Sequence, residues 1–266
     1  ASDVYKRQLK HDKTSVKKRP AFTQEEYRTL WLFLLTWQYK THNPRIRRDR
    51  TLLRYYVLIM LNSGMRIGEA RGLKWRDVSI YQNGNGQWVT LNVKGKTGER
   101  LVVCQPGVEK YFDKLKERDY RTDPDDLVFC HPDGLPIQNW TGFASMLKAA
   151  GIEFDTNGDR HTVYSLRHTY ATFRLQNGTN VYWLKKNMGT SVAMIERHYG
   201  QTNVLVGIEH ETAKRDQPAT PKRSKTLRSN EASQDVITIA KDTDDLVPVG
   251  AVDMTPAFDD IDTGIE

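Results

Sequence analysis

The first helix indicated by the pattern of apolar positions begins at Thr23. Glu26 follows three residues later, which is the spacing of a capping box. The apolar residues that come next fall on one helical face: Leu30, Phe33, Leu34 and Trp37. A further apolar run predicts a second helix from about Leu52 to Asn62, which stops at Gly64.

Residues 77–104 change to the period of β-structure. The segments 79–81, 87–93 and 100–104 are rich in strand-forming residues, and Gly- and Asn-rich turns separate them. Short turns between neighbouring strands are typical of hairpins. This region therefore predicts a three-stranded antiparallel meander.

The helical pattern returns near 107–118, 139–150, 164–177, 180–188 and 191–199. Gly151 and Gly178 stand where two of these helices should end. The predicted fold class is therefore mostly α with a small three-stranded antiparallel β-sheet (α+β).

The two ends of the chain lack this patterning. Residues 1–20 carry seven Lys or Arg against two Asp and predict a basic linker or arm. Residues 21–212 hold the patterned segments and predict one folded domain. Residues 213–266 are rich in Lys, Ser, Thr, Pro and Asp with few apolar anchors, so we expect a mostly disordered tail that is acidic at its end.

The charge is distributed unevenly along the chain. Lys and Arg exceed Asp and Glu by 40 to 33, but residues 241–266 contain eight acids and one base. The other 240 residues therefore carry about +14, which favours a polyanionic partner such as nucleic acid. The acidic end could compete with that partner for the basic surface, or it could be a solvated tail without effect.

The cysteine spacing argues against a disulfide-rich protein, and the lengths of the apolar segments argue against a membrane-spanning one. Cys104 and Cys130 are too few for a disulfide framework and have no metal-type spacing, so we interpret both as buried reduced thiols. No apolar stretch reaches the ~18–20 residues of a membrane span. We expect a cytoplasmic protein without a membrane partner, a metal or a cofactor.

Four side chains suited to phosphoryl chemistry recur in distinctive contexts: Arg66, Lys96, Arg167 and Tyr199. Two guanidiniums can clamp a phosphate, an ammonium can protonate a leaving oxygen, and a phenol can attack phosphorus. In this order and spacing the set resembles the tyrosine recombinases, the phage-integrase family, over roughly residues 20–205. The resemblance implies that residues 21–212 form a catalytic domain of that type.

Arg66 alone could be a surface arginine that pairs with Glu69 one turn later. Integrases, however, carry a Gly-x-Arg-x-x-Glu signature, and this chain matches it at Gly64, Arg66 and Glu69. The resemblance implies that Arg66 holds a non-bridging phosphate oxygen and that Glu69 orients it from behind.

Lys96 lies in a Gly-flanked turn and by itself could be an ordinary solvent-facing lysine. A phosphate-binding P-loop is excluded, because its first Gly would fall on Thr90 and a strand follows where a helix is needed. The family places its general-acid lysine in this β-hairpin. Lys94 is the competing candidate, and we prefer Lys96 because it lies in the turn itself.

Arg167 matches the family's His-x-x-Arg pattern, but Tyr164 stands at the histidine position. A tyrosine can donate a hydrogen bond to phosphate, yet it shuttles protons poorly near neutral pH because its reference pKa is ~10 against ~6.5 for histidine. His161 lies nearby and could compensate. His168 is interpreted as a supporting, structural histidine.

Tyr199 is one of twelve tyrosines and could be a core residue, so its candidacy rests on its position 32 residues after Arg167. The segment Met188-Gly189-Thr190 looks like the family's Leu-Gly-His, which places Thr190 where His or Trp is usual. A hydroxyl can still bond a phosphate oxygen, although it cannot carry charge.

The resemblance implies a site-specific DNA recombinase that cleaves and rejoins strands through a 3′-phosphotyrosyl intermediate. It implies double-stranded attachment sites as partners, a homotetramer on DNA and a location at the nucleoid. Family members usually carry a separate DNA-binding domain before the catalytic one, and that domain is expected to be absent from this sequence, where only the basic segment 1–20 precedes the catalytic domain. Either the sequence is a fragment, or the basic arm supplies what contact it can. Expected DNA contacts outside the catalytic set are Arg45, Arg47, Arg48, Lys94, Arg197 and His198.

Two other functions stay open at this stage. A type IB topoisomerase shares the clamp and the phenol nucleophile, and strand exchange between two duplexes would separate it from a recombinase. A non-catalytic DNA-binding regulator on the same fold is favoured if Tyr164 and Thr190 mark a loss of activity. Trapping of a covalent protein–DNA complex would separate that regulator from an enzyme.

Overall fold

The computed structural model describes residues 20–84, 86–95, 98–138 and 140–197. Its helices are α2 (Gln24–Trp37), α3 (Pro44–Ser63), α4 (Ile67–Gly72), α5 (Glu109–Lys116), α6 (Trp140–Ala149), α7 (Val163–Gln176) and α8 (Val181–Met188). The strands are β1 (Val78–Asn83), β2 (Gly86–Gly95) and β3 (Gly98–Val103), and a 3-10 turn, η1 (Trp75–Asp77), precedes them. The helical and β segments expected from the sequence are therefore present. The predicted basic arm and the acidic tail lie outside the described residues.

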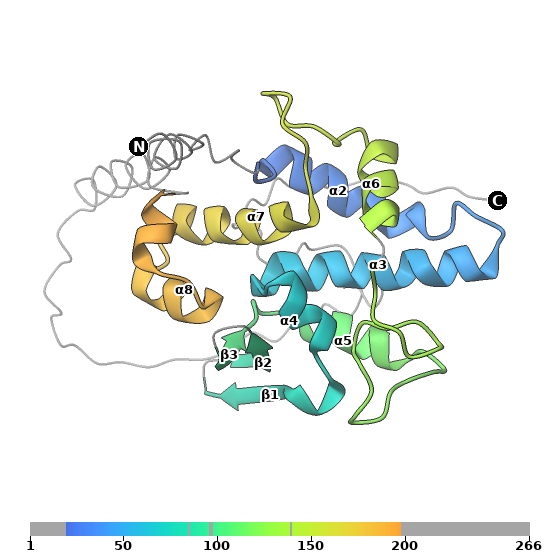
Figure 1. The fold of residues 1–266 in the computed structure, drawn as a ribbon, viewed down its shortest axis with the longest axis horizontal. Helices are drawn as coiled ribbons and strands as arrows, with labels where there is room; N and C mark the ends of the chain where they lie inside the picture. Colours follow the sequence, from blue (N-terminus) through green and yellow to red (C-terminus); the bar gives the residue numbers. More distant parts are fainter. Residues whose placement is uncertain (1–19, 85, 96–97, 139, 198–266) are drawn as a thin grey trace, which may run out of the picture.

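Helix α3 is the centre of the fold, and the other helices pack around it (Figure 1). From Leu52 to Ser63 nearly every α3 residue is buried, which is typical of a helix covered on all sides. It contacts α2, α5, α6 and α7. Burial of this one helix joins the segments around it into the main core. A second, smaller cluster consists of Tyr170, Ala171, Leu175, Leu184, Met188 and Ile195.

The sequence-based start of α3, near Leu52, is wrong. The helix begins at Pro44, capped by the Asn43 side chain, which accepts hydrogen bonds from the backbone N–H groups of Arg45 and Ile46. Proline at the first helical position is favourable because its missing N–H is not needed there. The first two turns are exposed and rich in arginine, so they show no apolar pattern.

The start of α2 confirms the predicted capping box. Thr23 Oγ1 accepts from the Glu26 N–H at 3.2 Å, and Glu26 Oε2 accepts from the Thr23 N–H at 2.7 Å. The face formed by Leu30, Leu34 and Trp37 is buried, as the spacing indicated.

The three strands form one antiparallel sheet in the order β1-β2-β3, which confirms the meander. On β2 the side chains of Val89, Leu91 and Val93 face the core, while Lys94 on the alternate face is exposed. The register pairs Gly95 with Gly98 at one end of the sheet. That end lies against α4.

Cys104 and Cys130 are buried and carry free thiols, as the sequence indicated. Burial raises the pKa of the Cys104 thiol well above its usual range. Within the described part of the chain, no helix is both long and apolar enough to span a membrane.

Candidate active site

Arg66 is positioned by the sharp end of α3. Gly64 closes that helix in the left-handed region (φ +65°) and lies directly on the Tyr170 ring. Arg66 then caps α4, and about a third of its side chain is exposed. Its guanidinium donates to Glu69 Oε1 at 2.8 Å and to the carbonyl of Gly189, at the end of α8.

Glu69 is a buried carboxylate shared by two arginines. Its Oε2 accepts from the Arg66 backbone N–H at 2.8 Å and from Arg100 Nη2 at 2.6 Å. Burial alone would raise the pKa of Glu69, but the backbone hydrogen bond and the two guanidiniums outweigh it and hold that pKa below its usual range. Glu69 is therefore charged and fixed behind Arg66, as the family signature implied.

Arg167 reaches the same place from α7. Its guanidinium donates to the carbonyl of Gly64 and, at 2.7 Å, to the carbonyl of Met188. Since Arg66 bonds the next carbonyl, that of Gly189, the two predicted phosphate ligands converge on the C-terminus of α8. The sequence separates them by a hundred residues, and the fold brings them together.

The β2–β3 end of the sheet lies beside this pair. A methyl group built on Gly95 would come within 2.9 Å of Glu69 Oε1 and 3.6 Å of Arg66 Nη1, so a glycine is needed for this close approach. Lys94 is exposed and pairs with Glu99 at 2.7 Å, and this pairing raises the pKa of Lys94. Lys96, the preferred candidate, lies outside the described residues.

Tyr164 and Thr190, the two departures from the family pattern, both lie in the described part of the chain. Tyr164 lies in the first turn of α7, one turn before Arg167, and its side chain is exposed. Thr190 is half-buried directly after Gly189, and its N–H bonds the carbonyl of Lys185. Along the chain the two residues lie on either side of Arg167, and Thr190 directly follows the Gly189 carbonyl that Arg66 binds.

The two histidines of this region differ in their surroundings. His168 is half-buried on α7, next to Arg167 in the chain. The His161 ring is fully buried, stacks on Phe22 at 4.1 Å and has Nε2 3.4 Å from Glu26. These contacts with Phe22 and with Glu26 on α2 hold the ring in the interior of the fold. No contact of His161 with the residues that the structure describes supports the suggestion that it compensates for Tyr164.

The segment that leads to Tyr199 starts as the sequence indicated. Ser191 Oγ accepts from the Met194 N–H at 3.1 Å, and residues 192–197 are helical. Arg197 is exposed on this helix. Tyr199 and His198 lie outside the described residues.

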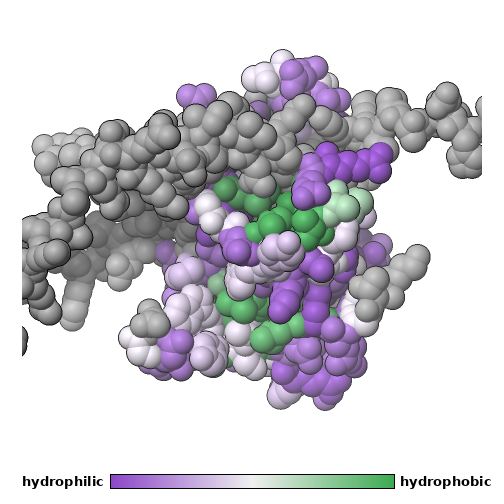
Figure 2. Space-filling model, turned by 90° about the vertical axis from the view of Figure 1, so that its left-hand side faces the viewer, coloured by the Kyte–Doolittle hydropathy of each residue, from purple (hydrophilic) through white to green (hydrophobic). Residues whose placement is uncertain are grey.

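Figure 2 looks at the end of the molecule where α7, α8 and the sheet meet. Hydrophobic residues lie there in patches among hydrophilic ones. Large apolar side chains exposed on α8 and on the helix after it include Tyr182, Trp183 and Met194.

The family model for the phage integrase family matches residues 22–204, which is more than half of the chain. This chain belongs to the phage integrase family. The chain resembles tyrosine recombinase XerD of Lacticaseibacillus casei, with 27% identity over 183 residues that cover 65% of this chain and 57% of the relative. It also resembles tyrosine recombinase XerD of Listeria monocytogenes serotype 4b (strain F2365), with 28% identity over 157 residues, 56% of this chain and 48% of the relative.

The chain spans about half the length of the curated relatives that it matches. Among solved structures it resembles XerH recombinase bound to a palindromic difH substrate, with a TM-score of 0.55, 21% identity, and coverage of 74% of this chain and 54% of that chain. It also resembles a lambda integrase dimer bound to a COC′ core site, with a TM-score of 0.52, 17% identity, and coverage of 72% and 63%. These likenesses confirm the predicted fold, that of tyrosine recombinase catalytic domains.

Arg100 and Asn187 belong to this site, and the sequence reasoning missed both. Arg100 on β3 donates to Glu69 and to the carbonyl of Asn187, and only 14% of its side chain is exposed. Its signal in the sequence was strand alternation: it shares the inward face of β3 with buried Val102. A charged residue at such a position indicates a buried ion pair.

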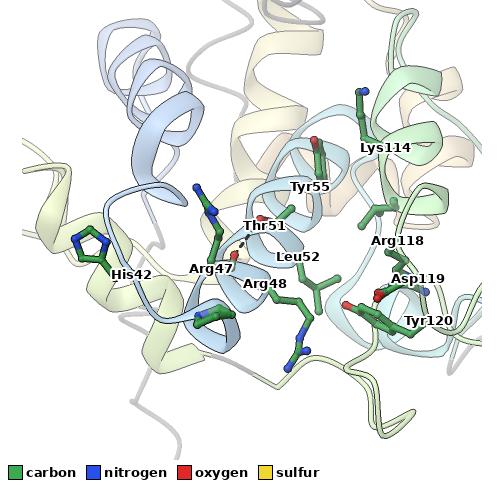
Figure 3. A pocket seen from close by; sticks show the side chains of 12 residues that line it. His42, Arg47, Arg48, Thr51, Leu52, Tyr55, Lys114, Arg118, Asp119 and Tyr120 are labelled. Atoms are coloured by element: carbon green, nitrogen blue, oxygen red, sulfur yellow. Dashed lines mark hydrogen bonds between the residues drawn. The ribbon is translucent and has the colours of Figure 1, made fainter. Parts of the chain in front are cut away.

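Arg47 and Arg48, two of the expected DNA contacts, line a pocket of about 330 Å³ between the start of α3 and the end of α5 (Figure 3). Lys114, Arg118 and Tyr120 form the opposite side of the pocket. The Arg48 guanidinium lies 6.0 Å, and that of Arg118 4.9 Å, from the centre of the Tyr120 ring. Arg45 is exposed in the same turn of α3.

Among the described residues, no group of three or more His, Cys, Asp or Glu could hold a metal ion.

Proposed function

We propose that this integrase is a site-specific recombinase whose described residues hold the scissile phosphate of double-stranded DNA. The observation that carries the proposal is the convergence of Arg66 and Arg167 on one partly exposed spot, backed by Glu69. A phosphodiester gains negative charge on its equatorial oxygens during attack, and preorganised cations at that place stabilise it. Bidentate guanidiniums suit this geometry better than ammonium groups do.

In the proposed reaction the Tyr199 phenol gives its proton to solvent, its oxygen attacks phosphorus, and the bond from phosphorus to the 5′ oxygen breaks. Lys96 donates a proton to that leaving oxygen, which departs as a 5′-hydroxyl. The product is a 3′-phosphotyrosyl bond. A 5′-hydroxyl of another strand reverses the same steps, so rejoining needs no nucleotide hydrolysis.

The assignment of the general acid to Lys96 is supported by its neighbours. Gly95, which precedes it in the chain, lies within contact distance of Arg66 and Glu69. The competing residue, Lys94, is engaged by Glu99 on the exposed face of the sheet. An ammonium whose pKa is raised by a carboxylate is the poorer proton donor.

Tyr164 and Thr190 are proposed as neutral hydrogen-bond donors to the phosphate. Tyr164 shares a face of α7 with Arg167, three residues away, and Thr190 follows the carbonyl that Arg66 binds. His168 supports Arg167 from the same helix. Neutral donors stabilise an anion less than charged ones do, so the reaction is expected to be slow for its class.

The basic pocket at the start of α3 is proposed as a DNA-backbone contact. It lies about 22 Å from the end of α3 at the arginine pair, at ~1.5 Å per residue for the 15 residues between Arg48 and Ser63. This distance suits a second phosphate on the same duplex. Further proposed contacts are Arg45, Lys94, Arg197 and His198, and the proposed assembly is a homotetramer on attachment-site DNA at the nucleoid.

The test is covalent trapping from a pool of nicked duplexes of randomised sequence, because the attachment site is unknown. The chain and its Tyr199→Phe variant are incubated with the pool, and adducts that resist detergent are separated on a denaturing gel. We expect an adduct with the wild type alone and equal DNA binding by both proteins. An equal adduct in the variant would overturn the nucleophile, and none in either would favour the non-catalytic regulator.

A further inference from the structure

Three successive carbonyls at the end of α8 each accept a hydrogen bond from a different arginine. The Asn187 carbonyl accepts from Arg100, that of Met188 from Arg167, and that of Gly189 from Arg66. The last carbonyls of a helix have no partner within it and form the negative end of its dipole. Guanidiniums from three separate elements therefore satisfy one helix end.

Each of the three guanidinium nitrogens of Arg100 donates to a protein acceptor. Its Nη2 lies 2.6 Å and its Nε 3.3 Å from the two Glu69 oxygens, and its Nη1 bonds the carbonyl of Asn187. Its side chain is less exposed than that of Arg66, 14% against 34%. Arg100 is thus placed behind the phosphate site and not in it.

The surroundings of Arg100 fit this position closely. Gly189 has φ +60°, and a methyl group on it would come within 2.5 Å of Arg100 Nε. The Asn187 side chain accepts from the Val103 N–H at 2.7 Å and donates to the Tyr170 hydroxyl at 2.8 Å. The strand that carries Arg100 and the end of α8 therefore form one rigid frame.

The charge of the cluster shows what Arg100 contributes. Glu69 alone with Arg66 would form a neutral pair, and a neutral pair attracts phosphate weakly. With Arg100 the three side chains carry a net charge of +1, so Arg66 keeps an uncompensated positive charge toward the exposed side.

We propose that Arg100 is a positioning residue, which shares Glu69 and fixes the end of α8 so that Arg66 is both oriented and electrostatically available to a phosphate. This inference rests on the proposed role of Arg66 and Arg167 as phosphate ligands. It predicts that the charge of Arg100 matters for anion binding although Arg100 does not touch the anion.

The test uses inorganic sulfate, which needs neither the attachment site nor catalysis. Sulfate is titrated into the full chain while the side-chain Nε–H signals of Arg66 and Arg167 are followed by NMR. We expect Arg100→Gln to weaken sulfate binding at these signals about tenfold, as for the loss of one nearby unit charge. Arg100→Lys, which keeps the charge, should lose less than threefold.

The matched control is Arg76→Gln, which removes an exposed arginine paired with Asp125 and should leave sulfate affinity within twofold of the wild type. If Arg100→Gln does not fold, Arg100→Gln/Glu69→Gln carries the test, because it removes both buried charges and restores the net +1. That double variant should bind within about threefold of the wild type.

Several outcomes would overturn the inference. These are an unchanged affinity in Arg100→Gln, an equal loss in Arg100→Gln and Arg100→Lys, or a tenfold loss in the double variant. If sulfate fails to shift the Arg66 and Arg167 signals of the wild type, the assignment of these two residues as phosphate ligands is wrong, and the inference on Arg100 is refuted as well. Binding by the wild type without an effect of Arg100 would refute the inference alone.

Discussion

Arg66 and Arg167, the two proposed phosphate ligands, are both held by acceptors of the protein. A guanidinium has five N–H donors in a fixed fork, so it can bond a carbonyl and a phosphate together. Arg66 uses Glu69 and the Gly189 carbonyl, and Arg167 uses the carbonyls of Gly64 and Met188. The orientation of both is therefore set before any phosphate arrives.

We predict that changing either Arg66 or Arg167 to lysine lowers the cleavage rate about 100-fold or more. Lysine keeps the charge but loses the bidentate fork and the contacts that orient it. Single-turnover cleavage of trapped substrates measures the effect, with Arg76→Lys as an exposed control. A rate within about threefold of the wild type would show that the altered residue does not hold the phosphate.

Glu69 should make the protein sensitive to acid. Its pKa is lowered by folding, so its contribution to stability is present above the unfolded-state value of ~4.3 and is lost as the pH falls through the folded value. We predict that the free energy of unfolding falls less steeply from pH 5 to pH 3 in Glu69→Gln than in the wild type. Urea unfolding at several pH values measures this, and parallel curves would contradict it.

The sequence identified the residues that lie in local motifs, and it missed those defined by distant partners. Arg66 and Glu69 are three positions apart, and Gly64 before them gives the turn a recognisable pattern. Arg100 bonds a carboxylate 31 positions away and a carbonyl 87 positions away. Only the folded chain brings these groups together.

At the scale of elements, apolar spacing predicted which segments form helices and strands but not where all of them begin. Helix α3 starts eight residues before its apolar face does, because its Arg-rich turns face outward. Asn43 and Pro44 marked that start by their capping chemistry. The strand meander was easier to predict, because alternation and turn glycines agree there.

Gly64 is the element boundary on which the site depends most. We predict that Gly64→Ala destabilises the protein by about 2–4 kcal/mol, from the positive φ and from the clash of the new methyl with the Tyr170 ring. Gly68→Ala, where a methyl meets nothing within 4 Å, should instead be neutral or stabilising by up to about 1 kcal/mol. Chemical denaturation of both variants tests this, and equal effects would contradict it.

For the whole molecule, the family and the fold follow from the sequence, while the DNA-binding surface stays a prediction. The charge excess of the first 240 residues favours a polyanionic partner, but it gives no location for the contact. The pocket at the start of α3 is the location that we propose for a DNA contact, because Arg47 and Arg48 face Lys114 and Arg118 across it.

We predict that Arg47→Gln/Arg48→Gln weakens DNA binding and reduces the slope of log affinity against log salt by about two, one for each lost phosphate contact. The matched control is Arg76→Gln/Arg160→Gln, which removes two exposed arginines that already pair with Asp125 and Glu153. Binding isotherms at several salt concentrations measure both variants. An unchanged slope in the first variant would exclude the pocket as a backbone contact.

The central claim, that Tyr199 forms the covalent bond to DNA, is tested most directly by finding which side chain is joined to the DNA after cleavage. Trypsin cleaves after Arg197 and Lys214, and the peptide between them contains Tyr199 as its single tyrosine. After nuclease digestion of the trapped adduct, mass spectrometry should find a nucleotide on that peptide, joined to Tyr199 through its 3′-phosphate. A nucleotide on any other peptide, or one attached through a 5′-phosphate, would contradict the account.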